Sequence, residues 1–120
     1  MFTKEVKMEE MYSVDSEEGK IICFKVKSYE RKIGEVVLKV KDKRLWLDLL
    51  IVEKEFRNRG FGKLILSYIE RFALNTGLKE IALNPYPYSS SIEELKEWYR
   101  ERGFKELKDN LMFKRLDEYV

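Results

Sequence analysis

The sequence predicts an α+β fold, a mixed α/β sandwich whose sheet is antiparallel in its first half and flanked by helices. Alternating apolar patterns joined by short turns fill residues 21–52, and short turns force neighbouring strands to run antiparallel. Two stretches with helical spacing follow, and the short apolar segment Ile81–Leu83 lies between them. A strand, a helix and a strand with short joints form a parallel crossover.

The first strands follow from alternating apolar residues. Residues 21–29 alternate from Phe24 onward, residues 30–34 form a hairpin turn, and residues 35–41 alternate again. A turn at 42–44 leads into Leu45–Val52, an apolar run broken only by Asp48. Such a run is typical of a strand covered on both faces, so we expect it inside the sheet. Residues 1–12 fit a short strand or a helix, and residues 13–20 a polar loop.

The helices are predicted by spacing and by their end signals. The first begins near residues 60–63, ends at Gly77, and buries one face at helical spacing, made of Leu64, Ile65, Tyr68, Ile69 and Phe72. The second begins with a capping box, Ser91 and Glu94, and ends at Gly103; its buried stripe is Ile92, Leu95, Trp98 and Tyr99. Two prolines keep residues 84–91 in a loop, and residues 104–116 form a closing hairpin.

Composition predicts one domain, residues 1–120, with one core. Charged residues make up 38% of the chain, yet the net charge is only +2, which argues against a nucleic-acid partner. A single cysteine cannot form an internal disulfide, and neither a signal peptide nor a long apolar segment is present. We therefore expect a cytoplasmic protein without membrane contact.

Histidine is absent from the chain. This excludes nucleophile relays that depend on histidine and leaves any metal site to carboxylates and one thiol. Acid–base chemistry falls to tyrosine, carboxylates, lysine, cysteine, water or the backbone.

The turn between the strand at 45–52 and the first helix has the features of an anion site. The first amides of a helix have no partners within it, its dipole favours negative charge, and Gly60 and Gly62 allow close approach to the backbone. Between Glu53 and Lys63 the chain carries four cations and two anions. These features predict a phosphate-binding turn.

Spacing excludes two common nucleotide sites. A P-loop needs a glycine where Arg57 stands and a serine or threonine where Leu64 stands. A dinucleotide fingerprint needs a third glycine where Ile65 stands, and it follows its strand directly.

The pattern Arg57-x-x-Gly60-x-Gly62, followed later by Tyr99-x-x-x-Gly103-Phe104, resembles the GCN5-related N-acetyltransferases (GNAT). The pyrophosphate loop of that family is Arg/Gln-x-x-Gly-x-Gly/Ala, and its later helix ends in Tyr-x-x-x-Gly-Phe. The resemblance spans roughly residues 33–116. It implies the acyl-CoA N-acyltransferase fold, here with a shortened N-terminal helical region, and acetyl-CoA as cosubstrate without a metal.

The resemblance also implies roles for residues of the turn and its strand. The backbone of Leu50, Ile51 and Val52 is expected to hold the pantetheine and the acetyl group, and one amide near Ile51 or Val52 to polarise the acetyl carbonyl. The loop begins at Arg57, and the amides that bind the diphosphate are those of Asn58, Arg59, Gly60, Phe61, Gly62 and Lys63.

Tyr99 stands where the family places the tyrosine that protonates the departing thiolate, so it is the expected general acid. The general base stays open between Asp48, Glu53 and a water chain. Where several family members carry a carboxylate, this chain has Asn84.

The expected acceptor is a primary amine on a small molecule, a peptide or a protein. Tyr86, Tyr88 and Trp46 are candidates to flank the acceptor pocket, and aromatic residues in the proline-rich loop are also compatible with a homodimer contact. The alternative hypothesis is a non-catalytic CoA-binding or interaction module on the same scaffold.

Overall fold

The computed structural model describes residues 4–87 and 90–116. Within these ranges the elements follow one another as β1 (Lys7–Ser16), β2 (Gly19–Ser28), β3 (Arg31–Lys41), β4 (Arg44–Val52), the 3₁₀ turn η1 (Lys54–Phe56), α1 (Phe61–Asn75), β5 (Glu80–Leu83), α2 (Ile92–Arg100), β6 (Lys105–Glu106) and β7 (Met112–Arg115). The strands form one sheet in the order β1-β2-β3-β4-β5-β7-β6. Only the β4–β5 pair is parallel among these described strands. The predicted mixed sheet flanked by helices is confirmed.

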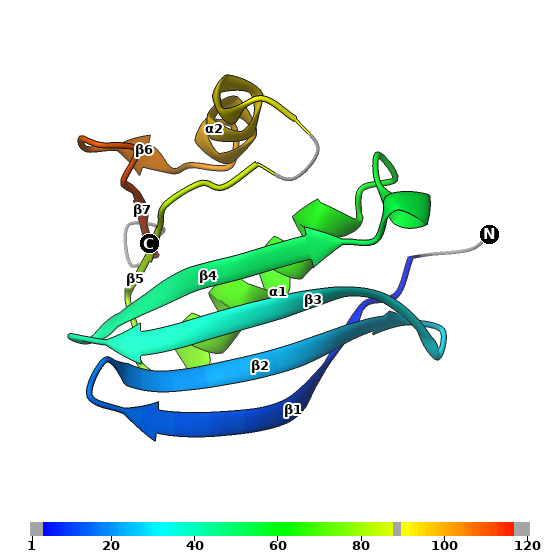
Figure 1. The fold of residues 1–120 in the computed structure, drawn as a ribbon, viewed down its shortest axis with the longest axis horizontal. Coiled ribbons are helices and arrows are strands. Elements are labelled where there is room, and N and C mark those ends of the chain that lie inside the picture. The colour runs from blue at the N-terminus through cyan, green and yellow to red at the C-terminus, as the bar shows by residue number, and fades with distance from the viewer. Residues whose placement is uncertain (1–3, 88–89, 117–120) are drawn as a thin grey trace.

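The sheet has two parts, which Figure 1 shows at an angle to one another. Strands β1–β4 form a broad curved meander, and α1 lies across one of its faces (Figure 1). Strands β5, β7 and β6 turn away from the meander, with α2 beside β6 (Figure 1). The two helices therefore belong to different parts of the sheet and meet where those parts separate.

The core lies between α1 and the meander. Apolar side chains of β2, β3 and β4 alternate toward the helix and are buried against it, among them Phe24, Val36 and Leu45. The matching face of α1 centres on Ile65 and Ile69, which are fully buried. This pairing follows from the two periods, since every second residue of a strand and every third or fourth residue of a helix share a face.

The expectation that both faces of β4 are covered is wrong. The side toward α1 is buried at Leu45 and Leu47, whereas Trp46 is half-buried and Asp48 is exposed on the other side. The reason is that α1 covers one face of the meander only (Figure 1).

The polar N-terminal segment is a strand rather than a loop from Ser13 to Ser16. These residues belong to β1, which pairs antiparallel with β2 from Lys7 to Ser16, with a bulge between Glu10 and Tyr12. Because β1 is an edge strand held mainly by backbone hydrogen bonds, it needs no alternating apolar pattern. A short turn leads from β1 directly into β2, so no helix precedes η1 in the described part of the chain.

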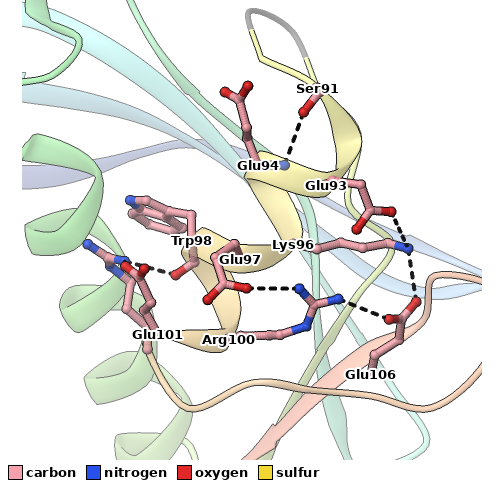
Figure 2. Close-up of polar contacts among 10 residues, drawn as sticks. Ser91, Glu93, Glu94, Lys96, Glu97, Trp98, Arg100, Glu101 and Glu106 are labelled. Atoms are coloured by element: carbon pink, nitrogen blue, oxygen red, sulfur yellow. Dashed lines mark hydrogen bonds and ion pairs between the residues drawn. The ribbon is translucent and has the colours of Figure 1, made fainter.

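The helical faces differ in detail from the predicted ones. Tyr68 is 41% exposed, with Arg71 over its ring, because the buried face of α1 turns toward Leu66 and Ala73 instead. In α2, Tyr99 is buried as predicted, but Lys96 is buried as well. The Lys96 ammonium lies 3.0 Å from Glu106 and 3.7 Å from Glu93 (Figure 2).

Each helix ends close to its predicted glycine. Helix α1 stops at Asn75, and Gly77 follows in a left-handed conformation. The last α-helical residue of α2 is Arg100, and hydrogen-bonded turns continue to Gly103. No helix in the described ranges reaches the length and apolar character that crossing a membrane requires.

Packing of α1 against the meander predicts a large cost for truncating Ile65. We expect Ile65→Ala to lower the free energy of unfolding by about 3 kcal/mol, because the side chain is fully buried and leaves a cavity. Leu74→Ala, on the 51% exposed Leu74 of the same helix, should change it by less than about 0.5 kcal/mol. Urea unfolding measures both, and equal losses would contradict this description of the core.

Candidate functional site

The site begins where β4 separates from β5. These strands pair at only two positions, Leu45 with Ile81 and Trp46 with Ala82. In the ladder with β3, Leu38 faces Leu47 and Val37 faces Leu49, so Asp48 between them is the extra residue of a β-bulge. A bulge bends and twists its strand. The second half of β4 therefore has β3 on one side and an open edge on the other.

The open edge of β4 presents backbone groups. The Glu53 N–H donates to the carbonyl of Ile33 on β3 at 2.7 Å. Because residues of an antiparallel pair alternate in direction, Ile51 also faces β3, whereas Leu50 and Val52 face the gap toward β5. Arg57 donates from Nε to the Val52 carbonyl at 2.8 Å. The Leu50 amide and carbonyl and the Val52 amide remain directed at the gap.

The loop after β4 brings the start of α1 beside this edge. Gly60 is left-handed with φ +85°, and Asn58 is left-handed with φ +61°. The first backbone hydrogen bond between α1 and the loop is donated by the Leu64 N–H to the Gly60 carbonyl, at 3.4 Å. The amides of Phe61, Gly62 and Lys63 precede it and have no partner within the helix.

The first turns of the two helices differ in their capping and in their charge. No side chain caps α1 within the described residues, and its first turn carries no acidic residue. In α2 the Ser91 hydroxyl accepts from the Glu94 N–H at 3.1 Å, and Glu93 and Glu94 occupy the first turn (Figure 2). The side-chain half of the predicted capping box is thus present. Only α1 is left with the positive end of its dipole available for an external anion.

The predicted loop cations occupy different places. Arg57 braces the loop through its bond to Val52, and Lys63 is exposed at the start of α1. Arg59 lies over the Phe56 ring, 5.7 Å from its centroid, and does not line the cleft. A further cation, Lys4, lies beside this loop, since a Cβ on Gly60 would lie 3.4 Å from the Lys4 Nζ. No motif in the sequence predicted a role for Lys4.

Helix α2 closes the other side of the gap with aromatic residues. A Cβ on Gly62 would lie 3.2 Å from Cζ2 of Trp98, so this indole contacts the first turn of α1. Tyr99 is 6% exposed and packs edge-on against Trp98 and Phe104. Burial raises the pKa of the Tyr99 phenol to about 12. Its hydroxyl therefore stays protonated at neutral pH.

The candidates for a base are not equivalent. Desolvation raises the pKa of the Asp48 carboxyl, and Lys39 opposes this shift. Asp48 lines the cleft, as does Asn84, which cannot accept a proton, whereas Glu53 does not line it. Of the two candidate carboxylates, only Asp48 is therefore at the cleft among the described residues.

These parts enclose a cleft of about 800 Å³. Its lining contains Tyr99 and Asp48 together with almost all predicted donor-binding residues, namely Leu50, Ile51, Val52, Arg57, Asn58, Gly60, Phe61, Gly62 and Lys63. Of the aromatic residues proposed for an acceptor pocket, Tyr86 lines the cleft, Trp46 does not, and Tyr88 lies outside the described residues. The lining also includes Glu94, Trp98 and Arg102. The sequence predicted Glu94 as part of a helix cap and Trp98 as a core residue, and it predicted no role for Arg102.

The arrangement accepts an elongated molecule with an anionic middle. A diphosphate fits the uncapped start of α1, and an amide-containing chain can pair with the open β4 edge as an added strand would. A thioester in the cleft would be bordered by the β4 edge and by Tyr99. The residues present therefore fit coenzyme A.

Comparisons with known proteins agree with this geometry. Residues 16–106 match the family model of the Acetyltransferase (GNAT) domain. No curated protein sequence matches the chain.

Solved structures share the fold at low sequence identity. The PaiA N-acetyltransferase of Thermoplasma acidophilum in complex with coenzyme A has a TM-score of 0.66 at 22% identity over 79% of this chain, which spans 60% of that protein's length. A GNAT family acetyltransferase of Elizabethkingia anophelis with acetyl-CoA bound has a TM-score of 0.70 at 16% identity, covering 92% of this chain and 98% of that one. A KacTA–DNA complex has a TM-score of 0.69 at 16% identity, with 95% of each chain covered.

The family model covers most of the chain. The chain therefore belongs to the GNAT acetyltransferase family.

Proposed function

We propose that this chain is an acetyl-CoA-dependent N-acetyltransferase that transfers the acetyl group to a primary amine by direct attack. One observation carries the proposal: a single cleft is lined by the open β4 edge, the uncapped start of α1 and Tyr99. The β4 edge suits a pantetheine chain, the start of α1 suits a diphosphate, and Tyr99 suits a departing thiolate. A cytoplasmic location, where acetyl-CoA is available, is part of the same proposal.

The chain's own groups have distinct roles in this reaction. The Val52 or Leu50 amide polarises the acetyl carbonyl and stabilises the oxyanion that forms when the amine nitrogen attacks. The new bond joins nitrogen to the carbonyl carbon, and the carbon–sulfur bond breaks. Asp48 takes the proton that the nitrogen loses, and Tyr99 gives a proton to the thiolate. Amide and free thiol are the products, and no covalent enzyme intermediate is involved.

The acceptor side of the cleft favours a cationic amine. Asp48 and Glu94 line the cleft together with the amide of Asn84 and the ring of Tyr86. Carboxylates attract an ammonium group and orient it before it loses its proton. Small amines, peptide N-termini and lysine side chains all have this chemistry.

Donor binding is tested by calorimetric titration with acetyl-CoA. Gly60→Ala and Gly77→Ala form a matched pair, since both glycines are left-handed (φ +85° and +80°) and lie at opposite ends of α1. Each should cost about 1 kcal/mol of stability through backbone strain. Only Gly60→Ala should weaken acetyl-CoA binding, by about tenfold, because its loop presents the α1 amides.

A wild-type protein that does not bind acetyl-CoA would remove the basis of the proposal. Binding without thiol release across a panel of amines, including peptide N-termini and lysine peptides, would instead support the non-catalytic CoA-binding module. Equal affinity losses in both glycine variants would contradict the assignment of the loop.

The general-acid role predicts the behaviour of Tyr99→Phe. Its kcat should fall about 100-fold, with the Kd for acetyl-CoA nearly unchanged, because only the hydroxyl is removed. Since the pKa of Tyr99 is raised to about 12, the wild-type kcat should show no alkaline loss from this group below about pH 11. Tyr68→Phe, on an exposed tyrosine of α1, is the control. Unchanged kcat in Tyr99→Phe would refute the assignment.

The base assignment predicts a pH effect for Asp48→Asn. A carboxylate must be ionised to accept a proton, so kcat/KM falls as pH drops through the Asp48 pKa, which lies above the usual aspartate value. Asp48→Asn should lower kcat/KM by at least about tenfold and abolish this acidic limb. If Glu53→Gln has that effect instead, Glu53 is the base; if neither does, a water chain serves.

A further inference from the structure

The face of the meander opposite α1, called the outer face here, carries an apolar band. The strand registers place outward-facing residues of β1 to β4 in two adjacent rows, one of Val14, Ile21, Lys39 and Trp46 and one of Tyr12, Cys23, Val37 and Leu49. Lys39 is the only polar residue of the two rows, and its ammonium lies over the Trp46 ring, 5.8 Å from the centroid. Because α1 lies on the other face (Figure 1), Tyr12 and Val14 remain 60% and 50% exposed.

This band departs from the pattern of a sheet face that stays in water. An antiparallel sheet with one solvated face normally has polar side chains on that face, and large apolar patches on a surface mark interaction sites. Strands β1 to β4 have 9 to 11 residues each. At their usual rise and spacing, the outer face measures roughly 33 Å by 19 Å, or about 600 Å². Two copies packed through it would bury about 1,200 Å² in total, which reaches the range of stable protein interfaces.

The row of outward-facing residues next to the band is charged and complementary to itself. It contains Glu9, Lys25, Glu35 and Ile51, one from each strand. Lys25 is half-buried and forms no ion pair with any residue in the described ranges, whereas Glu9 pairs with Lys27 at 3.1 Å.

A two-fold axis parallel to the strands, between β2 and β3, would set each row against the same row of a second copy. Strand β2 of one copy then lies over β3 of the other. Lys25 of each copy faces Glu35 of the partner subunit, and the apolar rows face one another. Both the apolar band and the charges beside it therefore fit a second copy of this chain.

The free edge of β1 is less suited to such a contact than the outer face. The register with β2 passes from Glu10 to Tyr12, which leaves Met11 as a bulge in the middle of the strand. A bulge twists an edge and interrupts the row of backbone groups that an added strand would need.

We propose that this chain forms a two-fold symmetric dimer in which the outer faces of two meanders pack against one another as aligned sheets. The inference does not depend on the proposed function, because the contact contains no ligand. Leu49 and Ile51 also line the cleft, so the partner subunit borders the cleft at the strand that carries Asp48.

Sedimentation equilibrium of the full chain without ligand tests the dimer. The wild type should associate with a Kd of about 10 μM or below. Val14→Lys should raise this Kd at least about tenfold, because it brings a charge into the apolar band. Leu74→Lys on α1 is the matched control, since Leu74 is 51% exposed and Val14 is 50% exposed; its Kd should equal that of the wild type.

An exchange of charges tests the orientation of the two copies. Lys25→Glu and Glu35→Lys each place like charges opposite one another, so each variant alone should dimerise at least about tenfold more weakly. An equimolar mixture of the two variants should dimerise as the wild type does, because opposite charges then face one another again. Circular dichroism of each variant checks that it is folded.

The wild type provides a further measurement without any substitution. Cys23 is the only cysteine of the chain and lies in the apolar band next to the two-fold axis. Its alkylation by a maleimide should slow at least about fivefold as the protein concentration rises through the Kd, because access to the thiol controls the reaction.

Three results would overturn the inference. The first is a wild type that stays monomeric at about 100 μM. The second is a dimer that Val14→Lys does not weaken or whose Cys23 reacts as fast as in the monomer, since either assigns the contact to another surface. The third is a mixture of Lys25→Glu and Glu35→Lys that associates no better than each variant alone.

Discussion

The structure depends on the point at which β4 stops pairing with β5. Sheet strands satisfy one another's backbone groups, so an edge left open inside a sheet exposes groups that need partners. Here two pairs of residues join the strands, and the bulge at Asp48 then turns β4 away. The resulting gap is both the cleft and the source of the amides that line it. The site is therefore a consequence of interrupted strand pairing rather than of a loop added to a finished sheet.

The first turns of α1 and α2 differ in how they are stabilised. Helix α2 satisfies its first turn with Ser91 and with two glutamates, an arrangement that stabilises a helix by itself. Helix α1 has no such cap in the described structure, and its 15 residues are held by the core face around Ile65 and Ile69 instead. Because packing holds α1 in place, its first amides are free to bind a ligand.

Helix α2 connects the separate contacts of the site. Trp98 and Tyr99 are among the residues of this helix that line the cleft, and Arg102, just after its end, lines it as well. Trp98 contacts the α1 start, and Arg102 stacks on Trp98. The position of α2 is itself fixed at β6, where Glu106 pairs with Lys96 and Arg100 (Figure 2). The closing hairpin thus supports the cleft without lining it.

The sequence by itself determined the elements with strong local signals: the strands from residue 21 onward, the loop at Arg57–Gly62, the Ser91 cap and the glycines that end both helices. These signals depend on neighbours close in the chain, so they can be read without the fold. Only the tertiary structure decided that polar residues 13–16 are an edge strand, that Tyr68 is exposed and Asp48 of β4 is exposed, and that Arg102 lies on Trp98. Such features depend on whether segments distant in sequence pack against one another, so the local hydrophobic periodicity does not predict them.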